Sequence, residues 1–133
     1  MGLAPDTLTF DCADPVAVAT FWAAALGYDL VDADPNGAYI ADPTAATRGM
    51  FFQPVPEPKT AKNRIHLDVR PTGTMQEEVD RLVGLGASVR GFIDKPASIV
   101  DGQPTFWTQM RDPEGNEFCV LRGPGDGWSP DEL

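Results

Sequence analysis

The chain has 133 residues, 42% hydrophobic and 23% charged, a composition typical of one compact globular domain and not of a disordered or fibrous protein. Ten Lys and Arg against twenty Asp and Glu give a net charge of -10, which disfavours nucleic acid and anionic membrane partners, because both are bound through Lys and Arg. Two cysteines, and no signal-peptide pattern in the first ten residues, lead us to expect reduced thiols and a cytoplasmic protein.

A strand and a helix open the predicted order of elements. Residues 7–10 alternate polar and apolar side chains, which predicts a strand. Asp14 can cap a helix and Pro15 can occupy its first turn, and the apolar spacing that follows predicts a helix over about 15–26 that ends at Gly27. Turn signals then separate three further predicted strands, at residues 28–32, 38–41 and 49–53.

The second half repeats this pattern after a Pro-rich connector at residues 54–63. Alternation over residues 64–69 predicts a strand. Thr74, followed three residues later by Glu77, is a capping box that predicts a helix ending at Leu85. Three more strands are expected, at residues 87–89, 105–110 and 117–121.

The two halves therefore share the order strand, helix and three strands. Gly27 and Gly86 end the two helices, and their offset of 86 - 27 = 59 residues places Thr7 opposite His66. We predict an α+β fold in which two tandem βαβββ modules form a curved, mostly antiparallel sheet around one cavity. The chain is then a single domain, residues 1–133, with modules at about 5–54 and 64–122, a linker at about 54–63 and an acidic tail at 123–133.

Three motifs resemble one protein family. They are Asp14-Pro15 with Phe21-Trp22 and Leu26-Gly27-Tyr28, then Asn63-Arg64-Ile65-His66-Leu67-Asp68, and Asp112-Pro113-Glu114-Gly115-Asn116-Glu117-Phe118-Cys119-Val120-Leu121. Over residues 5–122 the chain resembles glyoxalase-like proteins of the vicinal oxygen chelate superfamily, which includes glyoxalase I, bleomycin-resistance proteins and extradiol dioxygenases. The resemblance implies paired βαβββ modules around a small-molecule site, and a homodimer.

One face of the predicted strand at 64–69 is polar. Side chains of a strand alternate between its faces, so one set is expected to line the cavity: Arg64, His66, Asp68 and Arg70. Arg64 and Asp68 are predicted as ligand contacts, or as a pair that orients His66. His66 is either a site residue or a hydrogen-bonded strand residue.

The last strand places Glu117 and Cys119 on one side. We predict His66 and Glu117 as the catalytic pair, because an imidazole and a carboxylate can exchange protons with a ligand. Cys119 is either a ligand contact or a small buried hydrophobic residue. Gln53 and Trp107 are further predicted ligand contacts, the tryptophan by stacking, although packing in the core explains it equally well.

The resemblance also implies metal ligands in the first strand of each module and a carboxylate in the last strand. His66 occupies one of these positions, but Thr7 stands at the second and Cys119 at the third. A catalytic metal needs about three protein ligands. We therefore expect no native cofactor, and keep as the alternative a divalent ion (Zn, Ni, Mn or Fe) held by His66 and Glu117.

The predicted function is binding of a small organic molecule in the cavity, with catalysis left open. The alternative is a divalent-metal-dependent lyase, isomerase or dioxygenase of the same superfamily. A third hypothesis is a protein-interaction module that uses the acidic surface and Trp128. Residues 94–104 are expected to form either a flap over the cavity or a plain surface loop.

Overall fold

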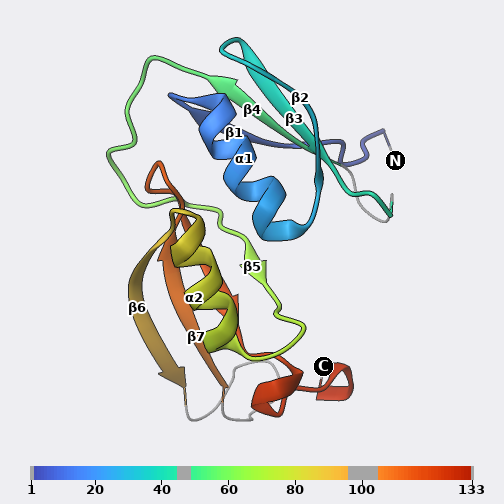
Figure 1. The fold of residues 1–133 in the computed structure, drawn as a ribbon, viewed down its shortest axis with the longest axis vertical. Coiled ribbons are helices and arrows are strands. Elements are labelled where there is room, and N and C mark those ends of the chain that lie inside the picture. The colour runs from blue at the N-terminus through green and yellow to red at the C-terminus, as the bar shows by residue number, and fades with distance from the viewer. Residues whose placement is uncertain (1, 45–48, 96–104, 133) are drawn as a thin grey trace. The chain divides into compact units, whose positions relative to one another are not determined.

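The computed structural model describes residues 2–44, 49–95 and 105–132. The chain divides into two compact units, residues 1–60 and 61–133 (Figure 1). Each unit is a four-stranded sheet with one helix, in the order strand, helix and three strands. The predicted α+β class with two tandem modules is therefore confirmed.

The first unit consists of β1 (Leu8–Cys12), α1 (Pro15–Leu26), β2 (Asp29–Asp34), β3 (Gly37–Ala41) and β4 (Met50–Pro54). Its strand order is β1-β4-β3-β2, with β1 and β4 parallel and the other pairs antiparallel. Helix α1 lies along one face of this sheet (Figure 1) and contacts β2, β3 and β4. The predicted helix bounds are confirmed.

Local signals and an aromatic core fix α1 on its sheet. The Asp14 carboxylate accepts a hydrogen bond from the N–H of Ala17 at 3.1 Å, and Gly27 ends the helix with a φ of 69°. Trp22 is 1% exposed, and its ring centroid lies 5.6 Å from that of Phe10. The buried sheet residues of this core include Ala38, Ile40, Met50 and Phe52.

The second unit consists of β5 (Asp68–Val69), α2 (Met75–Leu85), β6 (Ser88–Lys95), β7 (Thr105–Arg111) and β8 (Glu117–Leu121). The strand order is β5-β8-β7-β6, with β5 and β8 parallel. Helix α2 contacts β6, β7 and β8. Thr74 caps it by accepting the N–H of Glu77 at 3.2 Å, as the sequence predicts.

The strand predicted over residues 64–69 is wrong for most of its length. Only Asp68 and Val69 pair with β8, and Ile65, which alternation places on the face opposite His66, is 84% exposed. The backbone ladder does not continue to Glu117, whose side-chain carboxylate instead accepts the N–H of Asn63 at 3.0 Å. Residues 64–67 are therefore outside the strand, although the carbonyl of Leu67 still accepts the N–H of Cys119 at 2.9 Å.

Strand β6 is longer than predicted and includes residues 94–95, the first part of the expected flap. The rest of that flap, residues 96–104, lies outside the described residues. The long β6–β7 pairing explains the difference, because it extends to Lys95 opposite Thr105.

The C-terminal segment packs on the second unit. Asp126 accepts hydrogen bonds from the N–H groups of Met75 at 2.7 Å and Gly123 at 2.9 Å, and so adds a second cap to α2. The Trp128 ring centroid lies 4.0 Å from the guanidinium carbon of Arg70. Trp128, expected as a possible partner contact, is therefore engaged within its own chain.

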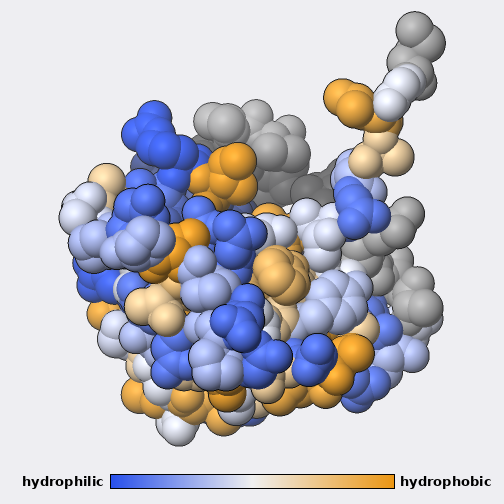
Figure 2. All heavy atoms as spheres, turned by 90° about the horizontal axis from the view of Figure 1, so that it is seen from above, coloured by the Kyte–Doolittle hydropathy of each residue, from blue (hydrophilic) through white to orange (hydrophobic). Residues whose placement is uncertain are grey.

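Figure 2 shows hydrophilic residues over most of the face that it draws, with hydrophobic residues in small groups between them. None of the helices in the described residues is long and apolar enough to cross a membrane.

Candidate functional site

The second sheet carries polar residues on the face opposite α2. In the sheet register Asp68 lies beside Cys119, and Cys119 lies beside Gln109. Their neighbours in sequence point the other way, since Thr108 is buried and bonds to the Met75 sulfur on α2. We name this set the polar row; it comprises His66, Asp68, Cys119, Gln109 and Arg90.

Three members of the polar row form a compact cluster. The Nδ1 atom of His66 lies 3.2 Å from Oδ1 of Asp68. One ring nitrogen of His66, a carboxylate oxygen of Asp68 and the sulfur of Cys119 all lie within 4.8 Å of one another. The side chains of His66 and Asp68 are 36% and 52% exposed, whereas Cys119 is buried. The cluster therefore has a buried thiol beneath an accessible imidazole and carboxylate.

The thiol of this cluster is held in its protonated form. Burial is the largest cause that raises the pKa of Cys119, from 9.0 to about 11. Asp68 raises this pKa further, by its negative charge and by its hydrogen bond with the thiol, while Lys62 and Arg90 act in the opposite direction. Because the thiolate is the nucleophilic form, Cys119 is not an activated nucleophile at neutral pH.

Two members of the polar row were missed by sequence reasoning. The β6–β7 register shifts between Val89 and Gly91, so Arg90 is the extra residue of a β-bulge. Its Nη1 donates a hydrogen bond to Oε1 of Gln109 at 2.6 Å. A signal was present in the sequence, because a glycine inside a strand pattern, here Gly91, marks a bulge.

Other predicted site residues lie near the cluster but have different contacts. Glu117 comes two residues before Cys119 in β8, and its carboxylate is anchored by the N–H of Asn63. Trp107 is half-buried in β7, where the register places it between Ile93 and Leu121.

Two further predicted site residues, Arg64 and Gln53, have surroundings that the sequence did not predict. Arg64 is exposed and forms no ion pair within residues 2–44, 49–95 and 105–132, so the structure does not contain the Arg64–Asp68 pair that was one of the two alternatives. The Asp68 carboxylate lies against His66 instead, because residues 64–67 are not in a strand and Arg64 is therefore not aligned with Asp68. Gln53 belongs to the first unit, where it is exposed in β4 opposite Asp11.

The donor set of the cluster fits a divalent ion of borderline softness. Zinc takes His nitrogen, Cys sulfur and carboxylate oxygen at about 2.0–2.3 Å, and a catalytic zinc site uses three such ligands. His66, Asp68 and Cys119 supply these three ligand types. Their ligand atoms lie up to 4.8 Å apart, and small rotations of the two accessible side chains would bring these atoms closer together around an ion. The predicted metal pair was His66 and Glu117, whereas here Asp68 and Cys119 accompany His66.

The fold and the motifs define one family. The model of the glyoxalase-like domain matches residues 7–121. The chain belongs to the glyoxalase-like domain family, within the vicinal oxygen chelate superfamily, and the resemblance drawn from the sequence motifs is confirmed. No curated protein matches the sequence.

Solved structures of low sequence identity share the fold. A glyoxalase-related enzyme from Fulvimarina pelagi is 16% identical, with a TM-score of 0.65 over 91% of this chain and 88% of that one. A glyoxalase/bleomycin resistance protein/dioxygenase family enzyme from Burkholderia phytofirmans PsJN is 17% identical, with a TM-score of 0.63 over 88% and 98%. A lactoylglutathione lyase from Agrobacterium tumefaciens is 17% identical, with a TM-score of 0.59 over 95% and 96%.

Proposed function

We propose that this glyoxalase-like protein binds a small polar organic molecule at the polar row of its second unit. The observation that carries the proposal is the His66 ring held against Asp68 at 3.2 Å, above the buried thiol of Cys119. A carboxylate that engages Nδ1 orients the imidazole and leaves Nε2 for a hydroxyl or carbonyl group of a ligand. His66 is then the proton-exchanging group, with Glu117 as the second predicted catalytic residue.

The rest of the polar row supports an oxygen-bearing ligand. The Arg90 guanidinium is held by Gln109 through one nitrogen, and its other N–H groups can donate to a carboxylate or carbonyl. Trp107, two residues from Gln109 on the same strand face, offers a half-buried ring to an apolar part of the ligand. We therefore propose a ligand with an oxygen acceptor at one end and a flat or apolar body.

A second candidate is a divalent-metal-dependent lyase, isomerase or dioxygenase. It is favoured by the three donor atoms within 4.8 Å, since proteins of the superfamily commonly use divalent metals. His66, Asp68 and Cys119 would hold the ion, which would supply Lewis-acid polarisation of a bound oxygen. Cys119 would have to lose a proton whose pKa is about 11, so binding would be favoured by rising pH. Glu117 would remain to move protons.

The two candidates are separated by ligand titrations of chelator-treated protein, followed by ¹H–¹⁵N NMR. The probes are small 2-hydroxy acids, 2-oxo acids and catechols, each tested with and without Zn²⁺. The first proposal expects at least one probe to shift the amide resonances of Asp68, Gln109 and Cys119 without metal, and to lose this effect in His66→Ala and Arg90→Gln. Thr7→Ala, at the equivalent position of the first unit, is the matched control and should bind normally.

Two outcomes of these titrations count against the first proposal. Shifts that survive in both variants would place the ligand elsewhere. Shifts that need Zn²⁺ would instead support the metal-dependent candidate.

We also propose that the chain forms a homodimer, as the resemblance to the superfamily implies, and that it works in the cytoplasm, in line with its free cysteines. Light scattering coupled to size exclusion should give twice the chain mass. A monomer over a wide concentration range would contradict the dimer.

A further inference from the structure

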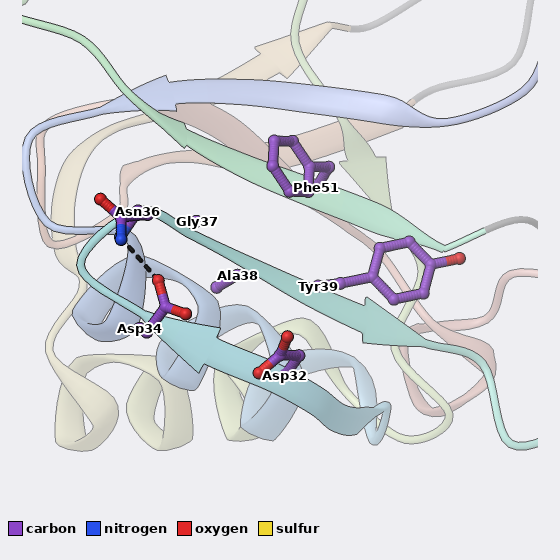
Figure 3. A pocket seen from close by; sticks show the side chains of 7 residues that line it. All are labelled: Asp32, Asp34, Asn36, Gly37, Ala38, Tyr39 and Phe51. Atoms are coloured by element: carbon purple, nitrogen blue, oxygen red, sulfur yellow. Dashed lines mark hydrogen bonds between the residues drawn. The ribbon is translucent and has the colours of Figure 1, made fainter.

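The first unit contains a hollow of about 220 Å³ at the turn between β2 and β3 (Figure 3). Asp32 and Asp34 on β2, Tyr39 on β3 and Phe51 on β4 are among the residues that line it. It lies on the sheet face opposite α1, because Ile40 and Phe52, which alternate with Tyr39 and Phe51, are fully buried, and α1 contacts β3 and β4. All of its lining belongs to one unit.

A β-bulge brings the carboxylates to the aromatic face. The β2–β3 register shifts between Leu30 and Asp32, which puts Asp32 opposite Tyr39, and Tyr39 lies opposite Phe51. Asp34 follows two residues later on the same face, opposite Gly37. We name Tyr39 and Phe51 the aromatic row, and Asp32 lies beside Tyr39 at the end of this row.

Gly37 in β3 and Gly49, just before β4, leave room for the two rings. A Cβ atom on Gly37 would come within 2.9 Å of Cζ of Phe51, so this ring lies directly over the glycine. A Cβ atom on Gly49 would overlap the phenol group of Tyr39. Figure 3 shows the Phe51 ring nearer the turn, the Tyr39 ring farther along β3, and both carboxylates on β2, with Asp34 close to Asn36 at the turn. The hollow therefore has an aromatic surface and an acidic edge.

The acidic edge has no cation of its own among the described residues. One oxygen of Asp34 accepts the N–H of Asn36 at 2.7 Å (Figure 3), which leaves its second oxygen accessible. The side chain of Asp32 forms neither a hydrogen bond nor an ion pair with any residue that the structure describes. The net charge of -10 adds a long-range attraction for positive ligands.

We propose that this hollow is a binding site for a small organic cation, an amidinium, guanidinium or ammonium group on a flat body. The charge would lie against Asp32 and Asp34, and the body against Tyr39 and Phe51, where ring faces also attract cations. Two exposed carboxylates alone would not define a site; the hollow and its aromatic surface give the ligand a place and a shape. At about 220 Å³ it suits a fragment-sized molecule, since drug-sized ligands occupy about 300–1,000 Å³.

The test uses benzamidinium as the probe, with neutral benzamide as its isostere, in ¹H–¹⁵N NMR titrations of the full chain. Benzamidinium should saturably shift the amide resonances of Asp32, Asp34 and Tyr39, whereas benzamide should not. Asp32→Asn should weaken binding roughly fivefold, the effect of one partly exposed charge. Asp29→Asn removes the same charge from β2 outside the lining, and should leave the affinity unchanged, as should His66→Ala.

Three results would overturn the proposal. They are equal binding of benzamidinium and benzamide, shifts confined to residues outside the hollow, and an affinity that Asp32→Asn does not alter. Because Asp32 is exposed, its asparagine variant is expected to fold, and its unperturbed spectrum verifies this before titration.

Discussion

The two units place different chemistry on the same backbone positions. Across the first sheet the register aligns Thr9, Phe51, Tyr39 and Asp32; across the second it aligns Asp68, Cys119, Gln109 and Gly91. Each outer hairpin has its bulge at the corresponding residue, Val31 and Arg90, which are 90 - 31 = 59 positions apart. The repeated backbone therefore supports an aromatic, acidic surface in one unit and a thiol, amide and guanidinium in the other.

The difference between Thr7 and His66 sharpens this comparison. Each of the two residues comes before the first paired strand residue of its own sheet. They are 59 positions apart, as the two glycines that end the helices are. Only the second unit has an imidazole there, and only there does a carboxylate follow two residues later, at Asp68. The proposed function therefore assigns proton exchange to the second unit.

The largest expected effect concerns the thiol of the polar row. With a pKa of about 11 instead of 9.0, Cys119 should react with iodoacetamide at pH 8 about a hundredfold more slowly than an unperturbed thiol, because its thiolate is that much rarer. The rate is measured in a Cys12→Ser background, so that only one thiol is followed. Asp68→Asn should speed the reaction, since it removes a neighbouring negative charge.

The same pKa predicts a pH dependence of stability. The folded protein holds the Cys119 proton more tightly than the unfolded chain, so this contribution is complete below pH 9 and is lost as pH rises through about 11. The free energy of unfolding should therefore fall more steeply from pH 9 to 11 than in Cys119→Ala. Urea titrations at each pH measure this free energy. If it fell equally with pH in both proteins, the raised pKa would be contradicted.

Glycine substitutions should distinguish the two units. Gly49→Ala should destabilise the protein by about 1–3 kcal/mol, because its Cβ atom would overlap Tyr39 and the carbonyl of Ile40. Gly91→Ala, at the bulge of the second unit, meets nothing within 4 Å and should cost far less. Urea unfolding measures both, and equal losses would mean that the aromatic row is not packed as described.

Removing the imidazole should affect ion binding at one unit alone. If the cluster takes Zn²⁺, His66→Ala should weaken this binding by about tenfold or more, because loss of a ligand costs at least as much as loss of an outer partner. Thr7→Ala should have no effect. Competition titrations with a zinc indicator measure both, and an equal response of the two variants would place the ion elsewhere.

The smallest effect concerns the second cap of α2. Asp126→Ala removes the acceptor for Met75 and Gly123 and should cost about 1 kcal/mol, which lowers the melting temperature by about 3 °C. Asp14→Ala, which removes the local cap of α1, should cost a similar amount. An unchanged melting temperature in Asp126→Ala would show that the C-terminal segment adds nothing to the helix.

The fold could be predicted because its signals are local. Asp14, Thr74, Gly27 and Gly86 define both helices within one turn of chain, and the predicted helix bounds agree with the structure. The segment before Asp68 was mispredicted because alternation alone does not reveal that the Glu117 side chain meets Asn63 from 54 residues away. A long-range side-chain anchor leaves no local pattern.

The candidate site was predictable only in part for a similar reason. Position in the motif selected His66, Asp68 and Cys119, which the structure does bring together. Arg90 and Gln109 were missed because a bulge changes which face a side chain occupies, and the pairing that creates it joins residues 19 apart. The pairing of Asp68 with His66 instead of Arg64 likewise depends on where β5 begins.

The central claim, that the His66–Asp68–Cys119 cluster is the ligand-binding centre, can be tested through the only histidine of the chain. With ¹⁵N-labelled histidine, the two ring resonances report on His66 without further assignment. We predict a ring with Nδ1 protonated and hydrogen-bonded to Asp68, altered in Asp68→Asn, whose Nε2 resonance shifts on titration with the oxygen-bearing probes. A ring that matches free imidazole in both forms and responds to none of these probes would contradict the claim.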